Sequence, residues 1–368
     1  MAHRFSYKPT GIRLSSQIDD LPIAVDGTFV DVQIEAPYGQ LVLSERYYAY
    51  NGSVSLYDIG SLIEAYMRSS GYTYADFTFK LLNASGGTDD TLTLSVLYCD
   101  RYTVCTDVPT FLKENFLTTL DHRRIAPDDT LSLFFFASQG ETLSYEVVVR
   151  WRMVGYEKIN LHKITLKQDE MVASSSVMQF NCAQPSWKLA LSKIHSLSVN
   201  EIEIVGYTLF IGKRSVTCYV DRSMSQYNCF MFRNAFNVWD VLTLPTTTTA
   251  KTEVERSTAV VNSTSSFYNQ QVVKTYEVER GPLTSDEAEW IDQLLTSYEV
   301  RRMVANAVDD TEPWMLEEVL ITDSDCEISD SDEPNTVKFT WRYADNRPEV
   351  RLSISKGIFS NSFDNVYS

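Results

Sequence analysis

The feature that most constrains the fold of this chain is an alternation of apolar and polar residues with a period of two, which recurs along most of its 368 residues. Successive side chains of a β-strand point to opposite faces, so this period places an apolar row on one side of a sheet. Three rows are clear: Val30, Val32, Ile34 and Ala36; Leu92, Leu94, Val96 and Tyr98; Tyr145, Val147, Val149, Trp151 and Met153. We therefore predict a mainly β fold (β-rich α+β) made of antiparallel β-sandwich-like domains.

Two short segments interrupt the strands with the spacing of amphipathic helices. Apolar residues recur at helical intervals between Asp58, a good N-cap residue, and Gly71, a good helix-terminating residue. A second helix is expected at about residues 285–297, where Thr284 and Glu287 have the spacing of a capping box. The run "VPTFLKENFLTTL" is compatible with a further short helix between strands.

The length of the chain favours two or three domains. We expect residues 1–154 to form an N-terminal β-sandwich-like domain with one helix, and residues 155–368 to form a C-terminal β-rich domain. The segment at about residues 245–267 is rich in Thr and poor in apolar residues. It predicts a long exposed hairpin or arm, and a flexible interdomain linker is the alternative.

The net charge of −17 opposes tight binding to nucleic acid, because phosphate contacts need a surplus of Lys and Arg. The nearest basic candidates, Arg123 with Arg124 and Lys213 with Arg214, are isolated pairs beside expected turns. We expect no direct tight contact with nucleic acid.

Much of the excess negative charge lies between residues 309 and 333, where no Lys or Arg interrupts the acidic residues. A solvated acidic loop is the simplest interpretation. The alternative is a Ca²⁺ site, for which the weak candidate ligands are Asp323, Asp325, Glu327, Asp330 and Asp332. The run "DSDCEISDSDE" lacks the central Gly and the terminal Glu spacing of an EF-hand loop, so we otherwise predict no metal and no cofactor.

Residue patterns of catalysis are missing from the sequence. It contains no HExxH, GxSxG, Walker A or GxGxxG motif, and its four histidines stand in unlike contexts. The six cysteines form no CxxC pair and are expected to be buried free thiols. We predict no catalytic residues, and therefore no enzyme. No apolar run has the length of a membrane span, and the N-terminus does not read as a secretory signal, which favours folding in the cytoplasm.

Several runs together resemble structural proteins of tailed bacteriophages and prophages of gut Bacteroidales-type bacteria. They are "YNGSVSLYDIGSLIEAYM", "FLKENFLTTL", "NCFMFRNAFNVWDVL", and "RGPLTSDEAEWIDQLLTSYEV" followed by "VLITDSD". The resemblance covers roughly residues 50–350 and lies in aromatic and apolar patterning. It implies a virion protein of the tail, tail tip or neck, assembled in the bacterial host cytoplasm. Its expected partners are copies of itself in a ring and other virion proteins.

The main alternative is a carbohydrate-binding or adhesive β-sandwich protein. Tyr47, Tyr48 and Tyr50, or Tyr72 with Tyr74, could form an aromatic face on which a sugar stacks. Ordinary packing of aromatic residues across strands explains the same pattern. An enzyme of unknown reaction is the third class. A long arm has no evident role in a monomer but could contact a neighbouring subunit, so we expect a homo-oligomer.

Overall fold

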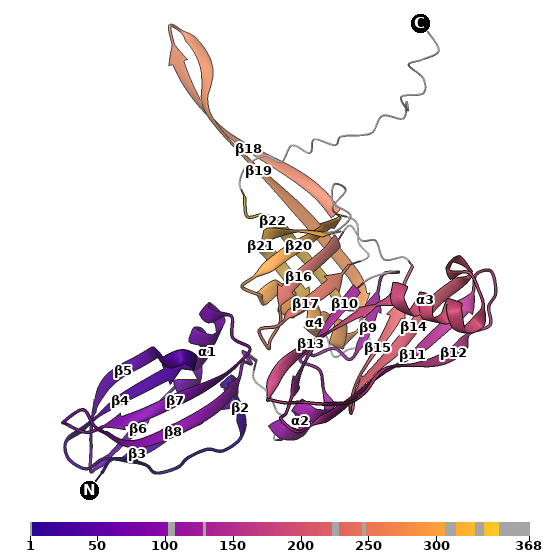
Figure 1. The fold of residues 1–368 in the computed structure, drawn as a ribbon. Helices are drawn as coiled ribbons and strands as arrows, with labels where there is room; N and C mark the ends of the chain where they lie inside the picture. Colours follow the sequence, from indigo (N-terminus) through magenta and orange to yellow (C-terminus); the bar gives the residue numbers. More distant parts are fainter. Residues whose placement is uncertain are drawn as a thin grey trace, which may run out of the picture.

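The computed structural model describes residues 2–101, 107–127, 130–222, 228–244, 248–305, 314–327 and 335–345. Strands dominate this part of the chain and pair mostly antiparallel, so the predicted mainly β fold is confirmed. The strands form three consecutive units, each around its own core, and a long hairpin projects from the third unit (Figure 1).

The N-terminal unit is a β-sandwich closed by helix α1. One sheet has the order β1-β3-β6 and the other the order β2-β8-β7-β4-β5. The elements are β1 (Arg4–Phe5), β2 (Ile12–Leu14), β3 (Leu21–Ala24), β4 (Phe29–Ala36), β5 (Gln40–Tyr48), β6 (Ser53–Leu56), α1 (Ile59–Ser70), β7 (Tyr74–Leu82) and β8 (Thr88–Leu97), with short 3-10 turns at Ser15–Gln17 and Pro37–Gly39. The predicted apolar rows of β4 and β8 are buried between the sheets, as expected from their alternation.

Helix α1 has the predicted position, but its N-terminus differs in detail. Gly71 ends the helix with a φ of 71°, as the sequence predicts. Asp58 occupies the N-cap position without accepting a backbone hydrogen bond, and its Oδ1 instead accepts from Ser61 Oγ at 2.5 Å.

The middle unit packs a two-stranded sheet, β10-β13, on a five-stranded sheet of order β12-β11-β14-β15-β9. The elements are α2 (Val108–Glu114), β9 (His122–Ile125), β10 (Thr130–Ala137), β11 (Thr142–Met153), β12 (Asn160–Met171), β13 (Ser176–Ala183), α3 (Gln184–His195), a 3-10 turn (Val199–Glu201), β14 (Ile202–Ile211) and β15 (Arg214–Val220). Helix α2 lies within the run suggested by the sequence. Helix α3 was not predicted, because only Trp187 and Leu191 mark its buried stripe.

The expected domain boundary between residues 154 and 155 needs correction. It falls between β11 and β12, which are hydrogen-bonded neighbours with Trp151 opposite Asn160. One core contains residues from Phe116 to Cys218, on both sides of that boundary. The units divide instead after β8 and between β15 and β16, because there the strands change from one sheet to the next.

The C-terminal unit is a seven-stranded sheet of order β17-β16-β20-β21-β22-β19-β18, with helix α4 packed on one face. Its elements are β16 (Cys229–Arg233), β17 (Trp239–Thr243), β18 (Thr248–Val261), β19 (Thr264–Leu283), α4 (Ser285–Thr296), β20 (Val300–Ala305), β21 (Trp314–Glu327) and β22 (Asn335–Tyr343). The capping box is present: Glu287 N donates to Thr284 Oγ1 at 3.2 Å, and Thr284 N donates to Glu287 Oε2 at 3.1 Å. The expected strand "VRLSIS" and the C-terminal segment lie outside the described residues.

Substitution of Leu294 in α4 tests this packing. Leu294 is fully buried in one core with Phe339 and Trp341, as the sequence predicts. Leu294→Ala is expected to lower the free energy of unfolding by about 2–4 kcal/mol through lost burial and the cavity left behind. Urea denaturation followed by tryptophan fluorescence measures the change, with Glu289→Ala on the exposed face of the helix as the control. An equal midpoint for the two variants would show that α4 is peripheral.

The thiols agree with their prediction where they are described. Cys99, Cys182, Cys218 and Cys229 are buried thiols, and Cys326 is partly buried. Burial raises the pKa of Cys218 to about 11, which keeps its thiol protonated and unreactive. Cys105 lies outside the described residues. None of the helices in the described ranges is long and apolar enough to cross a membrane.

Candidate functional site

The most exposed feature of the molecule is the hairpin of β18 and β19. Its root belongs to the seven-stranded sheet, because β19 pairs with β22 from Tyr276 inward. Residues 251–275, which we call the arm, are paired only with each other among the described strands. Each strand of the arm has about twelve residues, so the arm reaches roughly 40 Å beyond the sheet. Figure 1 shows it standing away from all three units.

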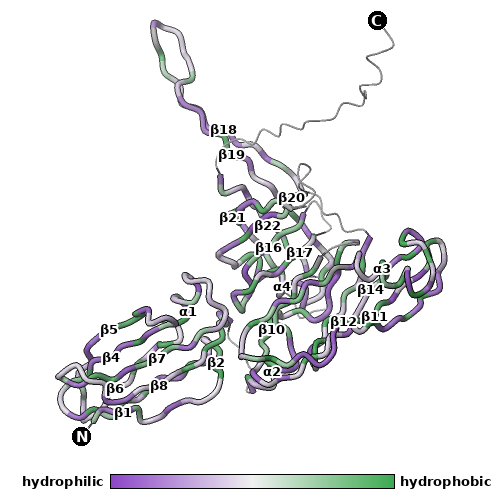
Figure 2. Tube along the Cα trace, in the orientation of Figure 1, coloured by the Kyte–Doolittle hydropathy of each residue, from purple (hydrophilic) through white to green (hydrophobic). Residues whose placement is uncertain are grey.

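The arm confirms the predicted hairpin and excludes the flexible linker for the residues described. The expected segment covered β18 but only the first residues of β19, so the arm continues farther than predicted. Its turn consists of Asn262 and Ser263, whose φ angles of 53° and 60° are those of a tight two-residue hairpin turn. Thr and Val, which suit exposed strands, are frequent in the rest of the arm, and the arm is mainly purple to white in Figure 2.

The register divides the arm into two chemically different faces. Side chains of paired residues share a face, and alternate pairs face the same way. Pairs 252/274, 254/272, 256/270, 258/267 and 260/265 lie on one face, which we call the basic face. It carries Arg256 and Lys274, together with the exposed Val260 and Phe267, and no acidic side chain. The opposite face carries Glu253 and Glu255, and at the root Lys251.

Two contacts shape the basic face near its tip. The Arg256 guanidinium lies 5.1 Å from the centre of the Phe267 ring and its Nε donates to Gln270 Oε1 at 3.1 Å. Phe267 remains 63% exposed and Val260 70% exposed, so this stacking leaves most of both side chains open. The neighbouring Tyr268, at the register shift of the hairpin, is 70% exposed.

The root of the arm, by contrast, is firmly anchored. Tyr276 stacks on the buried Trp341 with ring centres 4.3 Å apart. The Glu277 carboxylate accepts hydrogen bonds from Lys251 Nζ at 2.6 Å and from Lys338 Nζ at 2.5 Å. These hydrogen bonds lower the pKa of Glu277 to about 2. The arm therefore has a fixed base and a solvated tip.

The second notable site is the turn at residues 234–238, between β16 and β17, where the three units meet. Asn234 Oδ1 accepts from the backbone N–H of Phe236 at 2.9 Å and so shapes the turn. Asn234 Nδ2 donates to Leu117 O of the middle unit at 2.9 Å, and Asn237 Nδ2 donates to Tyr72 O of the N-terminal unit at 3.0 Å. One turn thus binds both neighbouring units.

Apolar contacts reinforce the same meeting point. Phe236 is buried and stacks on Phe111 of α2 with ring centres 5.8 Å apart. It belongs to a small core that also contains Leu14 and Leu97 from the N-terminal unit and Phe136 from the middle unit. The run "NAFNVWDV" therefore holds the units together.

A buried ion pair lies beside this turn. Arg123 of β9 donates from Nη1 to Asp240 Oδ1 at 2.6 Å and from Nη2 to Asp240 Oδ2 at 3.1 Å. The Asp240 carboxylate also accepts from Thr118 Oγ1 at 3.2 Å and from Trp290 Nε1 at 3.1 Å. Arg123 is 1% exposed and Asp240 2% exposed. This network ties the middle unit to the sheet and helix of the C-terminal unit.

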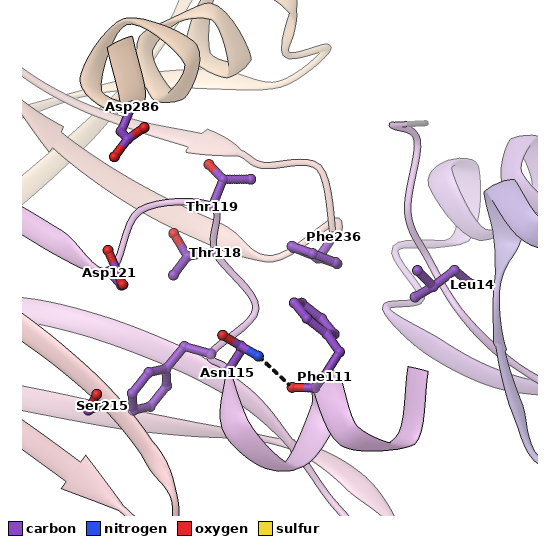
Figure 3. Close-up of a pocket in the computed structure, with 10 residues that line it drawn as sticks. Leu14, Phe111, Asn115, Thr118, Thr119, Asp121, Ser215, Phe236 and Asp286 are labelled. Carbon is purple, nitrogen blue, oxygen red and sulfur yellow. Dashed lines mark hydrogen bonds between the residues drawn. The ribbon is translucent and has the colours of Figure 1, made fainter. Parts of the chain in front are cut away.

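An open pocket of about 420 Å³ lies at the same junction and is lined by residues of all three units (Figure 3). Its apolar part consists of Leu14, Phe111 and Phe236, and Figure 3 places the acidic side chains of Asp121 and Asp286 at the other side. We call this the junction pocket. Asp121 is well exposed, and its Oδ1 lies 2.7 Å from His122 Nδ1.

The described acidic candidates for a metal site lie in a β-strand. Asp323 and Asp325 lie in strand β21 opposite Thr340 and Lys338, so this part of the expected acidic loop is strand. Pairing with β22 and the opposite charge of Lys338 explain the correction. Glu327 ends β21, and Asp330 and Asp332 lie outside the described residues. Within the described ranges, no three His, Cys, Asp or Glu residues are grouped to hold a metal ion.

The aromatic candidates divide into two groups. Tyr48 and Tyr50 are 74% and 80% exposed, whereas Tyr47 packs against the N-terminal core. Tyr72 and Tyr74 are engaged elsewhere, with Tyr72 beside Tyr66 and Tyr74 against Phe136 of the middle unit.

The basic pairs are the residues that the sequence interpretation placed least well. Arg123 and Arg214 are almost fully buried instead of lying at exposed turns. Lys213, the neighbour of Arg214, is exposed. Alternation along β9 separates the buried Arg123 from the half-buried Arg124, whereas Lys213 lies in the turn that precedes β15.

Histidines 162 and 195 lie together on the middle unit. Their ring centres are 5.2 Å apart, and His195 also packs on Trp151. These contacts agree with packed or surface histidines.

Comparisons with known proteins add little. No protein-family model and no curated protein matches the sequence. Among solved structures, the calcium-binding domain CBD12 of CALX1.1 is 8% identical, with a TM-score of 0.19 over 60% of this chain and 100% of that chain. The native form of E. coli alpha-2-macroglobulin is 8% identical, with a TM-score of 0.21 over 76% of this chain and 21% of that chain. Neither similarity supports an inference about fold or function.

Proposed function

We propose that this protein is a structural component of a tailed-bacteriophage virion, in the tail, tail tip or neck, and that it acts by protein–protein assembly and not by catalysis. The observation that carries the proposal is the arm: a long two-stranded ribbon with a fixed root and an exposed apolar tip. The resemblance of the sequence runs to phage structural proteins supports the choice of particle.

The arm favours assembly because an isolated two-stranded ribbon is at best marginally stable in water. The side chains near its tip gain little burial from their own chain, since Val260, Phe267 and Tyr268 all remain mostly exposed. A neighbouring subunit that covers these side chains would supply the missing burial. Arms and edge strands that pair with neighbours are a common way of linking subunits of one kind into larger assemblies.

The distribution of charge is compatible with a particle through which DNA passes. The chain carries a net charge of −17, with 49 acidic against 32 basic residues. A net negative charge repels phosphate and disfavours retention of the nucleic acid.

The test is the composition of particles released by the bacterium that carries the gene. We expect quantitative mass spectrometry of density-banded particles to find this chain in several copies per particle, in a ratio to the other virion proteins that stays constant across the band. Its absence from banded particles that contain the remaining virion proteins would overturn the proposal.

A carbohydrate-binding role is the second candidate, and the exposed Tyr48 and Tyr50 of the N-terminal sandwich favour it. Aromatic rings in the open can stack on sugar faces. Retention of the full chain on a glycan column, lost in Tyr48→Ala and Tyr50→Ala but kept in Tyr72→Ala, would support this role.

A further inference from the structure

We infer that the basic face of the arm docks into the junction pocket of a second copy of this chain. The inference rests on the proposed assembly function and specifies which surfaces meet. It follows from the chemistry of the two surfaces and from their places in the molecule.

The arm provides a ligand of suitable character. From Arg256 to Tyr276 the chain has two basic residues, Arg256 and Lys274, and no acidic residue, although the whole chain carries −17. Both basic side chains lie on the face that also presents Phe267 and Val260. Arg256 stacks against Phe267 at 5.1 Å, so a cation and an aromatic ring are offered side by side.

The junction pocket offers the complementary arrangement. Two carboxylates, Asp121 and Asp286, lie on one side of it, and the Phe111–Phe236 pair lies on the other (Figure 3). Its volume of about 420 Å³ is in the range of pockets that enclose a ligand of several side-chain groups. If the Phe267 ring enters beside the two phenylalanines of the pocket, the adjacent Arg256 guanidinium comes to the side that carries the two carboxylates. The contact then combines burial of the ring with charge complementarity.

The contact must be made between copies. The tip of the arm and helix α2, which forms part of the pocket, lie at opposite ends of the molecule in Figure 1. The arm is anchored at its root by Trp341 and Glu277, which hold it in that direction. One copy therefore presents its arm to one neighbour and its pocket to another. Such a head-to-tail contact closes into a ring when the rotation between copies permits, and otherwise continues as a filament.

Charge reversal on each side tests the docking directly. The arm-reversed chain carries Arg256→Glu and Lys274→Glu, and the pocket-reversed chain carries Asp121→Lys and Asp286→Lys. The control carries Glu253→Lys and Glu255→Lys, which change the opposite face of the arm. Sedimentation velocity of the purified full chain over a concentration series measures self-association, and circular dichroism confirms that each variant is folded.

We expect the unchanged chain and the control to self-associate, and each reversed chain alone to associate about tenfold or more weakly. An equimolar mixture of the two reversed chains should regain association, because every contact between unlike copies again joins opposite charges. Recovery in the mixture would not follow from docking at another surface. A chain that stays monomeric throughout the series, or a mixture that does not recover, would overturn the docking, whereas the particle composition tests the virion role independently.

Discussion

Asp240→Asn is expected to lower the free energy of unfolding by about 3–5 kcal/mol, because it leaves the Arg123 charge buried without its partner. Both oxygens of Asp240 accept hydrogen bonds, from Arg123, Thr118 and Trp290 among others. A neutral amide has one acceptor oxygen and turns an NH₂ group toward donors. The loss should therefore appear as a lower urea midpoint and a lower Tm.

Two comparisons make this result interpretable. Asp31 makes a similar two-pronged pair with Arg46, at 2.7 and 2.8 Å, but on the surface. Asp31→Asn should cost at most about 1 kcal/mol, since exposed pairs contribute little. The double variant Arg123→Met with Asp240→Leu removes both charges and should recover much of the loss. Equal costs for Asp240→Asn and Asp31→Asn would show that burial does not govern the pair.

The sequence predicts the strands well, because period-two alternation directly records which face is buried. The rows at Val30 and Leu92 and the capping box at Thr284 all appear where expected. The arm was also predictable, since a Thr-rich segment with few apolar residues cannot form a core.

The sequence does not reveal how the units meet. Its expected boundary at residues 154 and 155 divided a sheet, because the turn between two consecutive paired strands has the same turn residues, such as Gly155, as a turn between domains. The junction depends on contacts across long separations, such as Arg123 with Asp240 and Tyr74 with Phe136. In the sequence an inward-facing Arg looks the same as a solvated one until its partner is known. The sequence therefore does not predict the junction pocket, although the run "NAFNVWDV", whose turn lines it, stands out in the sequence.

Arg214→Met is expected to lower the free energy of unfolding by about 3–5 kcal/mol, whereas Lys213→Met beside it should change it by no more than about 0.5 kcal/mol. The Arg214 side chain is fully buried in the middle unit. Its guanidinium donates to Leu112 O at 2.6 Å and to Phe136 O at 2.7 Å, and it pairs with Glu141 at 2.8 Å. Met fills a similar volume but leaves both carbonyls without these donors and Glu141 without its cation, and each unsatisfied buried group costs about 1–3 kcal/mol.

Lys213, by contrast, is 74% exposed, and its ammonium lies 3.5 Å from Glu114 in a loose surface pair. The two substitutions remove one positive charge each from adjacent positions of the same hairpin, so their effects on net charge are equal. Urea denaturation of both variants at the same pH therefore isolates the contribution of burial. Because Arg214 holds α2 through Leu112, its loss should also loosen the α2 side of the junction pocket. Faster hydrogen exchange of the α2 amides in Arg214→Met, but not in Lys213→Met, is the expected signature. Equal urea midpoints for the two variants would contradict the assignment of Arg214 as the residue that holds α2 against the middle sheet.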